Sequence, residues 1–123
     1  MSKTILVVDD SATVRQQVKA FLQTNDFIVV EGGNGVEGLS QAKSQQADLV
    51  MVDVNMPVMS GIEMIGELRK LPGYDKTPIF VMTSESTPAM AAKGKEAGAT
   101  AWIVKPFKPE LVLKGIQKVL GMK

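Results

Sequence analysis

The chain has 123 residues, the usual size of one domain, and its 14 basic and 13 acidic side chains leave a net charge of +1. It contains no cysteine and no histidine, which excludes disulfides, thiolate or imidazole metal sites and a histidine general base. No basic block indicates nucleic-acid binding, and the apolar runs are too short to cross a bilayer. We therefore expect one cytoplasmic domain over residues 1–123, with no nucleic-acid partner and no membrane insertion.

Short apolar runs alternate along the chain with segments of helical periodicity. In chain order, strands are predicted at 4–8, 27–30, 49–52, 79–82 and 101–104. The helices that follow them are predicted after the cap Ser11, over 36–42, from the capping box Ser60/Glu63 to Pro72–Gly73, from Thr87–Pro88 to near Gly98, and from Pro109. Strands separated by helices pair in parallel, which predicts a three-layer α/β fold around a five-stranded sheet.

Polar side chains follow the predicted strands at their carboxyl ends. Asp9 and Asp10 follow the first strand, Asp53 the third, Thr83 the fourth and Lys105 the fifth. Taken singly, each has an ordinary interpretation as a helix cap or a surface lysine. In the strand order 2-1-3-4-5, however, the first and third strands are neighbours, so three carboxylates converge where such sheets bind ligands.

Three neighbouring carboxylates repel one another and need a cation. An all-oxygen site without histidine suits Mg²⁺, or else Mn²⁺, held by Asp9, Asp10, Asp53 and the backbone carbonyl of Asn55. A cation beside Asp53 also allows that carboxylate to attack phosphorus. The hydroxyl of Thr83 and the ammonium of Lys105 would then bind the phosphoryl oxygens.

Four segments of the chain together resemble the response-regulator receiver family. They are residues 5–11 (ILVVDDS), 53–61 (DVNMPVMSG), 82–84 (MTS) and 104–107 (VKPF), which lie in the family's order and spacing. The resemblance implies a flavodoxin-like (βα)5 fold, Asp53 as phosphoacceptor, and Thr83 and Lys105 as the switch hydroxyl and the lysine. In the family the peptide bond before Pro106 is commonly cis.

The resemblance also implies partners. With no output domain, the chain is similar to stand-alone chemotaxis regulators, whose donor is a CheA-type histidine kinase and whose target is a flagellar motor switch protein. We expect the target to bind the face formed by the fourth helix, fifth strand and fifth helix. The chain would catalyse only its own phosphorylation and dephosphorylation, with Asn55 and Glu85 affecting the lifetime of the phosphate. The alternative is a phosphorelay intermediate or phosphate sink without a motor target.

Trp102 departs from the family pattern, in which tyrosine or phenylalanine is usual at the switch position. We expect Trp102 either to act as the switch aromatic or simply to pack on the fifth strand. Gly94 lies inside the fourth predicted helix, where glycine weakens a helix by roughly 1 kcal/mol relative to alanine.

Residues 33–38 (GNGVEG) match the G-x-G-x-x-G pattern of dinucleotide-binding proteins. This enzyme alternative is disfavoured because the motif follows the second strand, which lies at the edge of the sheet and away from the switch point. A glycine-rich turn is a sufficient interpretation. An aspartyl-phosphate phosphatase is also disfavoured, because Asn55 replaces the second acid that such enzymes usually need.

Overall fold

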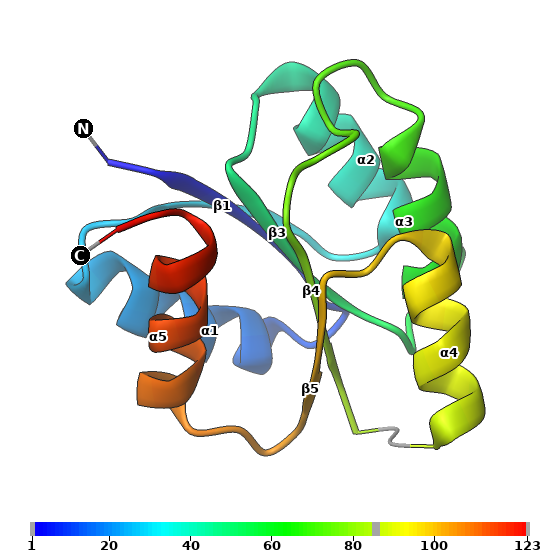
Figure 1. Cartoon of the computed structure of the whole chain (residues 1–123). Helices are drawn as coiled ribbons and strands as arrows, with labels where there is room; N and C mark the ends of the chain where they lie inside the picture. The colour runs from blue at the N-terminus through cyan, green and yellow to red at the C-terminus, as the bar shows by residue number, and fades with distance from the viewer. Residues whose placement is uncertain (1, 85–86, 123) are drawn as a thin grey trace.

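A parallel sheet with helices on both faces forms the framework of the protein (Figure 1). The computed structural model describes residues 2–84 and 87–122. Within these ranges, five strands pair in the order β2-β1-β3-β4-β5. Their bounds are β1 Thr4–Val8, β2 Ile28–Gly32, β3 Leu49–Asp53, β4 Ile79–Thr83 and β5 Ala101–Val104. The predicted strand order and the flavodoxin-like fold are confirmed.

Five helices in the described ranges form the two outer layers. They are α1 Ala12–Thr24, α2 Gly35–Ser44, α3 Gly61–Arg69, α4 Pro88–Ala97 and α5 Pro109–Val119. Helices α1 and α5 cover one face of the sheet, and α2, α3 and α4 cover the other (Figure 1). Alternate β1 side chains supply both cores: Ile5 and Val7 pack toward α1 and α5, and Leu6 and Val8 toward the opposite layer.

Side-chain caps begin the helices where the sequence predicts them. Ser11 accepts a hydrogen bond from the N–H of Val14, and Ser60 and Thr87 serve α3 and α4 in the same way. Gly98 ends α4 in the left-handed conformation, with φ of 118°. These local signals set the helix ends, and hence the loops that carry the polar strand-end residues.

Strand boundaries differ from the prediction in β2, β3 and β4, and β2 ends at Gly32 where the prediction ended it at Val30. Phe27 lies outside β2, because its N–H donates to the carbonyl of Leu22 at 3.1 Å and closes the turn after α1. Strands β3 and β4 each extend one residue further than predicted, so Asp53 and Thr83 are their last residues. Both side chains are therefore held by regular sheet pairing.

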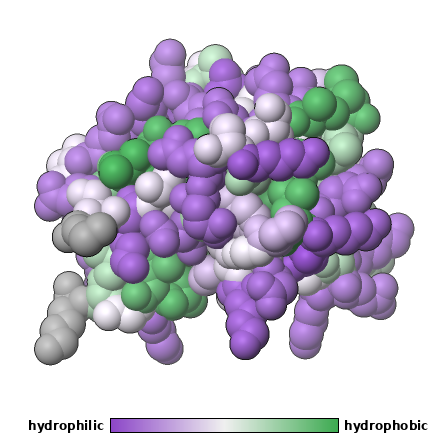
Figure 2. All heavy atoms as spheres, turned by 90° about the horizontal axis from the view of Figure 1, so that it is seen from above, coloured by the Kyte–Doolittle hydropathy of each residue, from purple (hydrophilic) through white to green (hydrophobic). Residues whose placement is uncertain are grey.

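The edge of the molecule where the strands begin carries mostly hydrophilic side chains, among which hydrophobic areas are scattered (Figure 2). In residues 2–84 and 87–122, no helix has the length and apolar composition needed to span a membrane.

Candidate functional site

Three carboxylates meet at the carboxyl edge of the sheet. Asp9 and Asp10 directly follow β1, Asp53 ends β3, and these strands pair so that Val8 lies beside Val52. One carboxylate oxygen from each aspartate lies within 4.8 Å of the others. Asp9 is fully buried and Asp53 is 7% exposed, whereas Asp10 is open to solvent. The convergence predicted from the strand ends is therefore present.

Lys105 reaches into this cluster from the loop after β5. Its ammonium nitrogen lies 2.8 Å from Oδ2 of Asp9 and 3.3 Å from Oδ2 of Asp53. Its backbone N–H donates to the carbonyl of Thr83 at 2.8 Å, which fixes the start of the loop, and the peptide bond to Pro106 is cis. In this structure the lysine thus occupies the position of a counter-ion for two carboxylates.

Burial and neighbouring charges shift the pKa values of Asp53 and Lys105. Burial raises the pKa of Asp53, the negative charge of Asp9 raises it further, and the Lys105 ammonium opposes both effects. For Lys105, burial would lower the pKa, but its hydrogen bonds and ion pairs with Asp9 and Asp53 together outweigh burial and raise it. Lys105 therefore stays protonated, and a second cation beside Asp53 would be favoured electrostatically.

Two further predicted residues, Thr83 and Asn55, lie on the strand next to β3 and in the loop after β3. Thr83 is fully buried at the end of β4. The Asn55 N–H donates to Oδ1 of Asp53 at 3.3 Å. A side chain at Gly61 would place its Cβ only 2.2 Å from the carbonyl oxygen of Asp53, so α3 begins against this backbone only because residue 61 is glycine.

Trp102 is half-buried and packs against the core between the sheet and α4. A Cβ on Gly94 would lie 2.6 Å from Cζ3 of the indole. Gly94 does lie inside α4, as the sequence predicts, but the indole occupies the space that an alanine methyl group would need. Glu85, expected to affect the phosphate lifetime, lies outside the described residues.

The glycine-rich turn after β2 is explained by packing. A Cβ on Gly38 would lie 2.7 Å from Cγ2 of Val8, and one on Gly35 would lie 2.8 Å from Cβ of Met59. The Gly33 N–H donates to Glu37 at 2.8 Å, which occupies one of the backbone donors that a dinucleotide phosphate would need. This arrangement agrees with the interpretation of the motif as a turn.

Sequence reasoning missed Arg15, whose guanidinium donates to the backbone carbonyl of Asp9. It also missed Glu31, near the end of β2, whose Oε1 lies 3.3 Å from Nε of Arg15. Two features of the sequence could have indicated this contact. Arg15 lies in the first turn of the helix that follows Asp9 and Asp10, and Glu31 lies near the end of the strand that pairs with β1.

Comparison with known proteins decides the family. The family described as "Response regulator receiver domain" matches residues 5–117. This chain belongs to the response regulator receiver family. Receiver domains accept phosphoryl groups from histidine kinases and bind Mg²⁺ through acidic residues, and here the acidic residues present are Asp9, Asp10 and Asp53. Three oxygen donors and no histidine fit that ion.

Individual relatives show which receivers this domain resembles. Chemotaxis protein CheY of Bacillus subtilis is 35% identical over 122 residues, which cover 98% of this chain and 100% of that protein. Transcriptional regulatory protein ResD of the same organism is 34% identical over 116 residues, but this receiver spans only 47% of its length. The structure of chemotaxis protein CheY4 of Vibrio cholerae superposes with a TM-score of 0.93 at 41% identity, covering 97% of this chain and 99% of that one. The chain is thus a CheY-like receiver domain of a two-component response regulator.

Proposed function

We propose that Asp53 is the phosphoacceptor of this receiver, and that Asp9, Asp10, Asp53 and the backbone carbonyl of Asn55 hold Mg²⁺, or Mn²⁺, beside it. The observation that carries the proposal is the meeting of three carboxylates with Lys105 at one edge of the sheet. The bound metal would supply charge that screens the repulsion between the attacking carboxylate and the phosphoryl oxygens.

The residues of the chain then share the transfer. An oxygen of the Asp53 carboxylate attacks phosphorus, the new P–O bond forms, and the bond from phosphorus to the histidine nitrogen of the donor breaks. The ammonium of Lys105, already 3.3 Å from Asp53, neutralises one phosphoryl oxygen, and the hydroxyl of Thr83 donates to another. The product carries about −1.5 to −2 charge in place of −1.

This added charge is the proposed trigger of the switch. Thr83 and Trp102 lie on neighbouring strands, since Thr83 pairs with Val104 and Val81 pairs with Trp102. A movement of Thr83 toward the phosphoryl group would alter the packing of Trp102 against α4. We propose Thr83 and Trp102 as the two residues that carry the signal from the site to the surface.

The partners we propose are a CheA-type histidine kinase as donor and a flagellar motor switch protein as target. The similarity to two chemotaxis proteins over nearly the whole chain supports a role in chemotaxis. The target would bind, in the cytoplasm, to the face formed by α4, β5 and α5. On this face the apolar side chains of Val104 and Leu111 are 43% and 61% exposed. On this proposal the domain catalyses only its own phosphorylation and dephosphorylation.

Transfer from a phosphorylated CheA-type kinase, followed by pull-down with a motor switch protein, tests this function. We expect the phosphoryl group to move to the wild-type receiver but not to Asp53→Asn. The motor protein should retain only the phosphorylated form. Transfer without any change in retention would favour the phosphate-sink alternative. Equal transfer to Asp53→Asn would contradict the proposed phosphoacceptor.

A further inference from the structure

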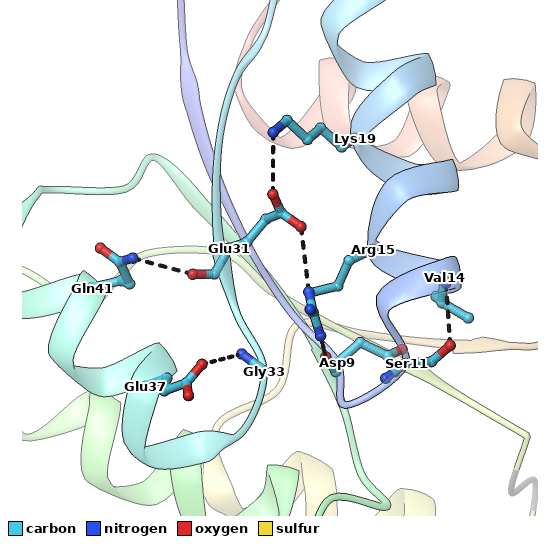
Figure 3. A network of polar contacts seen from close by, with 9 residues as sticks. All are labelled: Asp9, Ser11, Val14, Arg15, Lys19, Glu31, Gly33, Glu37 and Gln41. Carbon is cyan, nitrogen blue, oxygen red and sulfur yellow. Dashed lines mark hydrogen bonds and ion pairs between the residues drawn. The ribbon is translucent and has the colours of Figure 1, made fainter.

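A network of charged side chains connects the acidic site to the edge strand β2 (Figure 3). Its centre is Arg15, in the first turn of α1. One guanidinium nitrogen, Nη1, donates to the backbone carbonyl of Asp9, while Nε lies 3.3 Å from Oε1 of Glu31. Glu31 also accepts from Lys19 at 3.2 Å. A single planar guanidinium therefore bridges the end of β1 to the end of β2.

The acceptor is the carbonyl of the peptide unit that joins Asp9 to Asp10. On the other side of Asp9, its N–H donates to the carbonyl of Gly32 at 3.1 Å. The Asp9 carboxylate is separately held by the Ser11 N–H at 2.9 Å and by Lys105. Asp10, by contrast, is exposed, and its carboxylate has no hydrogen-bond or ion-pair partner among residues 2–84 and 87–122. The orientation of the Asp10 side chain thus depends on the peptide unit to which Arg15 is hydrogen-bonded.

Arg15 is itself fixed in place. Its side chain is 20% exposed and that of Glu31 is 31% exposed, so the pair lies partly out of solvent. The glycine-rich turn borders it, because a Cβ on Gly33 would be in ordinary van der Waals contact with Nη1 of Arg15, at 3.5 Å. The turn that resembles a dinucleotide motif therefore lies directly beside this guanidinium.

We infer that Arg15 is a positioning residue for the cation site, acting through the Asp9–Asp10 peptide unit to direct the Asp10 carboxylate. This inference rests on the proposed function, because it assumes that Asp10 is a metal ligand. Two effects of Arg15 on cation binding have opposite signs. Its positive charge disfavours a nearby cation, whereas its hydrogen bond orders a ligand. The sign of the change in affinity on removing Arg15 therefore identifies which effect dominates.

Calorimetric titration of the full chain with Mg²⁺ measures this sign. Arg15→Gln is too short to bridge Glu31 and Asp9, and we expect it to bind Mg²⁺ about tenfold more weakly than wild type. Lys19→Gln is the matched control, because it removes the same positive charge and likewise a donor to Glu31, whereas Lys19 does not contact Asp9. We expect its affinity to equal that of wild type. Arg15→Lys retains one donor for the Asp9 carbonyl and should recover part of the loss.

Thermal unfolding in the absence of metal separates positioning from folding. We expect Arg15→Gln and Lys19→Gln to be destabilised to similar small extents, with only Arg15→Gln losing Mg²⁺ affinity. Unchanged or tighter binding by Arg15→Gln, or an equal loss in Lys19→Gln, would overturn the role of Arg15 and leave the proposed function intact. A wild-type chain that does not bind Mg²⁺ would instead contradict the metal site itself, and with it both proposals.

Discussion

The indole of Trp102 occupies the space that a side chain at Gly94 would need. The ideal Cβ position of Gly94 lies 2.6 Å from Cζ3 and 3.1 Å from Cε3 of the ring. Because Trp102 is on β5 and Gly94 is on α4, this contact joins two elements of the proposed target face.

Gly94→Ala should therefore fail to stabilise the protein, although alanine favours a helix over glycine by about 1 kcal/mol. The added methyl group must displace the ring, so we also expect a change in Trp102 fluorescence. Gly66→Ala is the control, because Gly66 is inside α3 with no neighbour within 4 Å of its Cβ position. Gly66→Ala should raise the free energy of unfolding, measured with urea, by about 1 kcal/mol. Equal gains for both variants would contradict the contact.

Asp53→Asn should raise the melting temperature of the metal-free protein at neutral pH by about 4 °C, or about 1 kcal/mol. Burial and the charge of Asp9 raise the pKa of Asp53 in the folded state. The stability contributed by a raised pKa is fully present below the unfolded pKa and is lost as pH rises through the folded pKa. The ionised carboxylate is therefore destabilising at pH 7.

The pH dependence provides the control for this prediction. At about pH 3 and below, where the carboxylate is largely protonated in both the folded and the unfolded state, Asp53→Asn and wild type should melt together. Glu96→Gln removes the same charge from an exposed residue of α4 and should change the melting temperature little at either pH. An Asp53→Asn variant that is less stable than wild type at pH 7 would show that Lys105 more than offsets the burial of Asp53.

Lys105→Met should destabilise the metal-free protein by about 3 kcal/mol, because it leaves the buried Asp9 carboxylate without its counter-ion. Mg²⁺ should then restore more stability to this variant than to wild type, since the cation no longer shares the site with an ammonium. Melting curves with and without Mg²⁺ measure both effects. A smaller shift with Mg²⁺ in Lys105→Met than in wild type would contradict the competition between the two cations.

Val58→Asn should stabilise the protein by about 1 kcal/mol. Val58 has φ of 72° and is 81% exposed, so a β-branched side chain is held in the left-handed region without burial to compensate. The Met59 N–H donates to the Pro57 carbonyl at 2.8 Å, which closes a three-residue turn with Val58 at its centre. Asparagine is found at positive φ more often than alanine, so Val58→Ala should stabilise the protein less in chemical unfolding.

The sequence predicted the framework of the site well, because the framework depends on local signals. Apolar runs located the strands, caps such as Ser11 located the helices, and parallel pairing brought Asp9, Asp10 and Asp53 together. Contacts that depend on how layers pack were not predictable. Position 94 looked like a weak point of a helix until the indole of Trp102 was seen to fill it.

The charged network was missed for a similar reason. Arg15 and Glu31 are 16 residues apart, and nothing in either local segment indicates that they face each other. Their contact follows from the pairing of β1 with β2 and from the path of α1 across both strands. Most charged side chains are exposed to solvent, so only the three-dimensional arrangement identifies the one that reaches the site.

The central claim is that Asp53 accepts phosphorus with the help of a divalent cation. The most direct test is incubation with a small acyl phosphate donor, with Mg²⁺ or with a chelator, followed by mass spectrometry of the digested protein. We predict a single phosphoryl group on Asp53 that forms with Mg²⁺ and fails to form with the chelator. A stable phosphoryl group on another residue, or equal labelling of Asp53 in both conditions, would contradict the account.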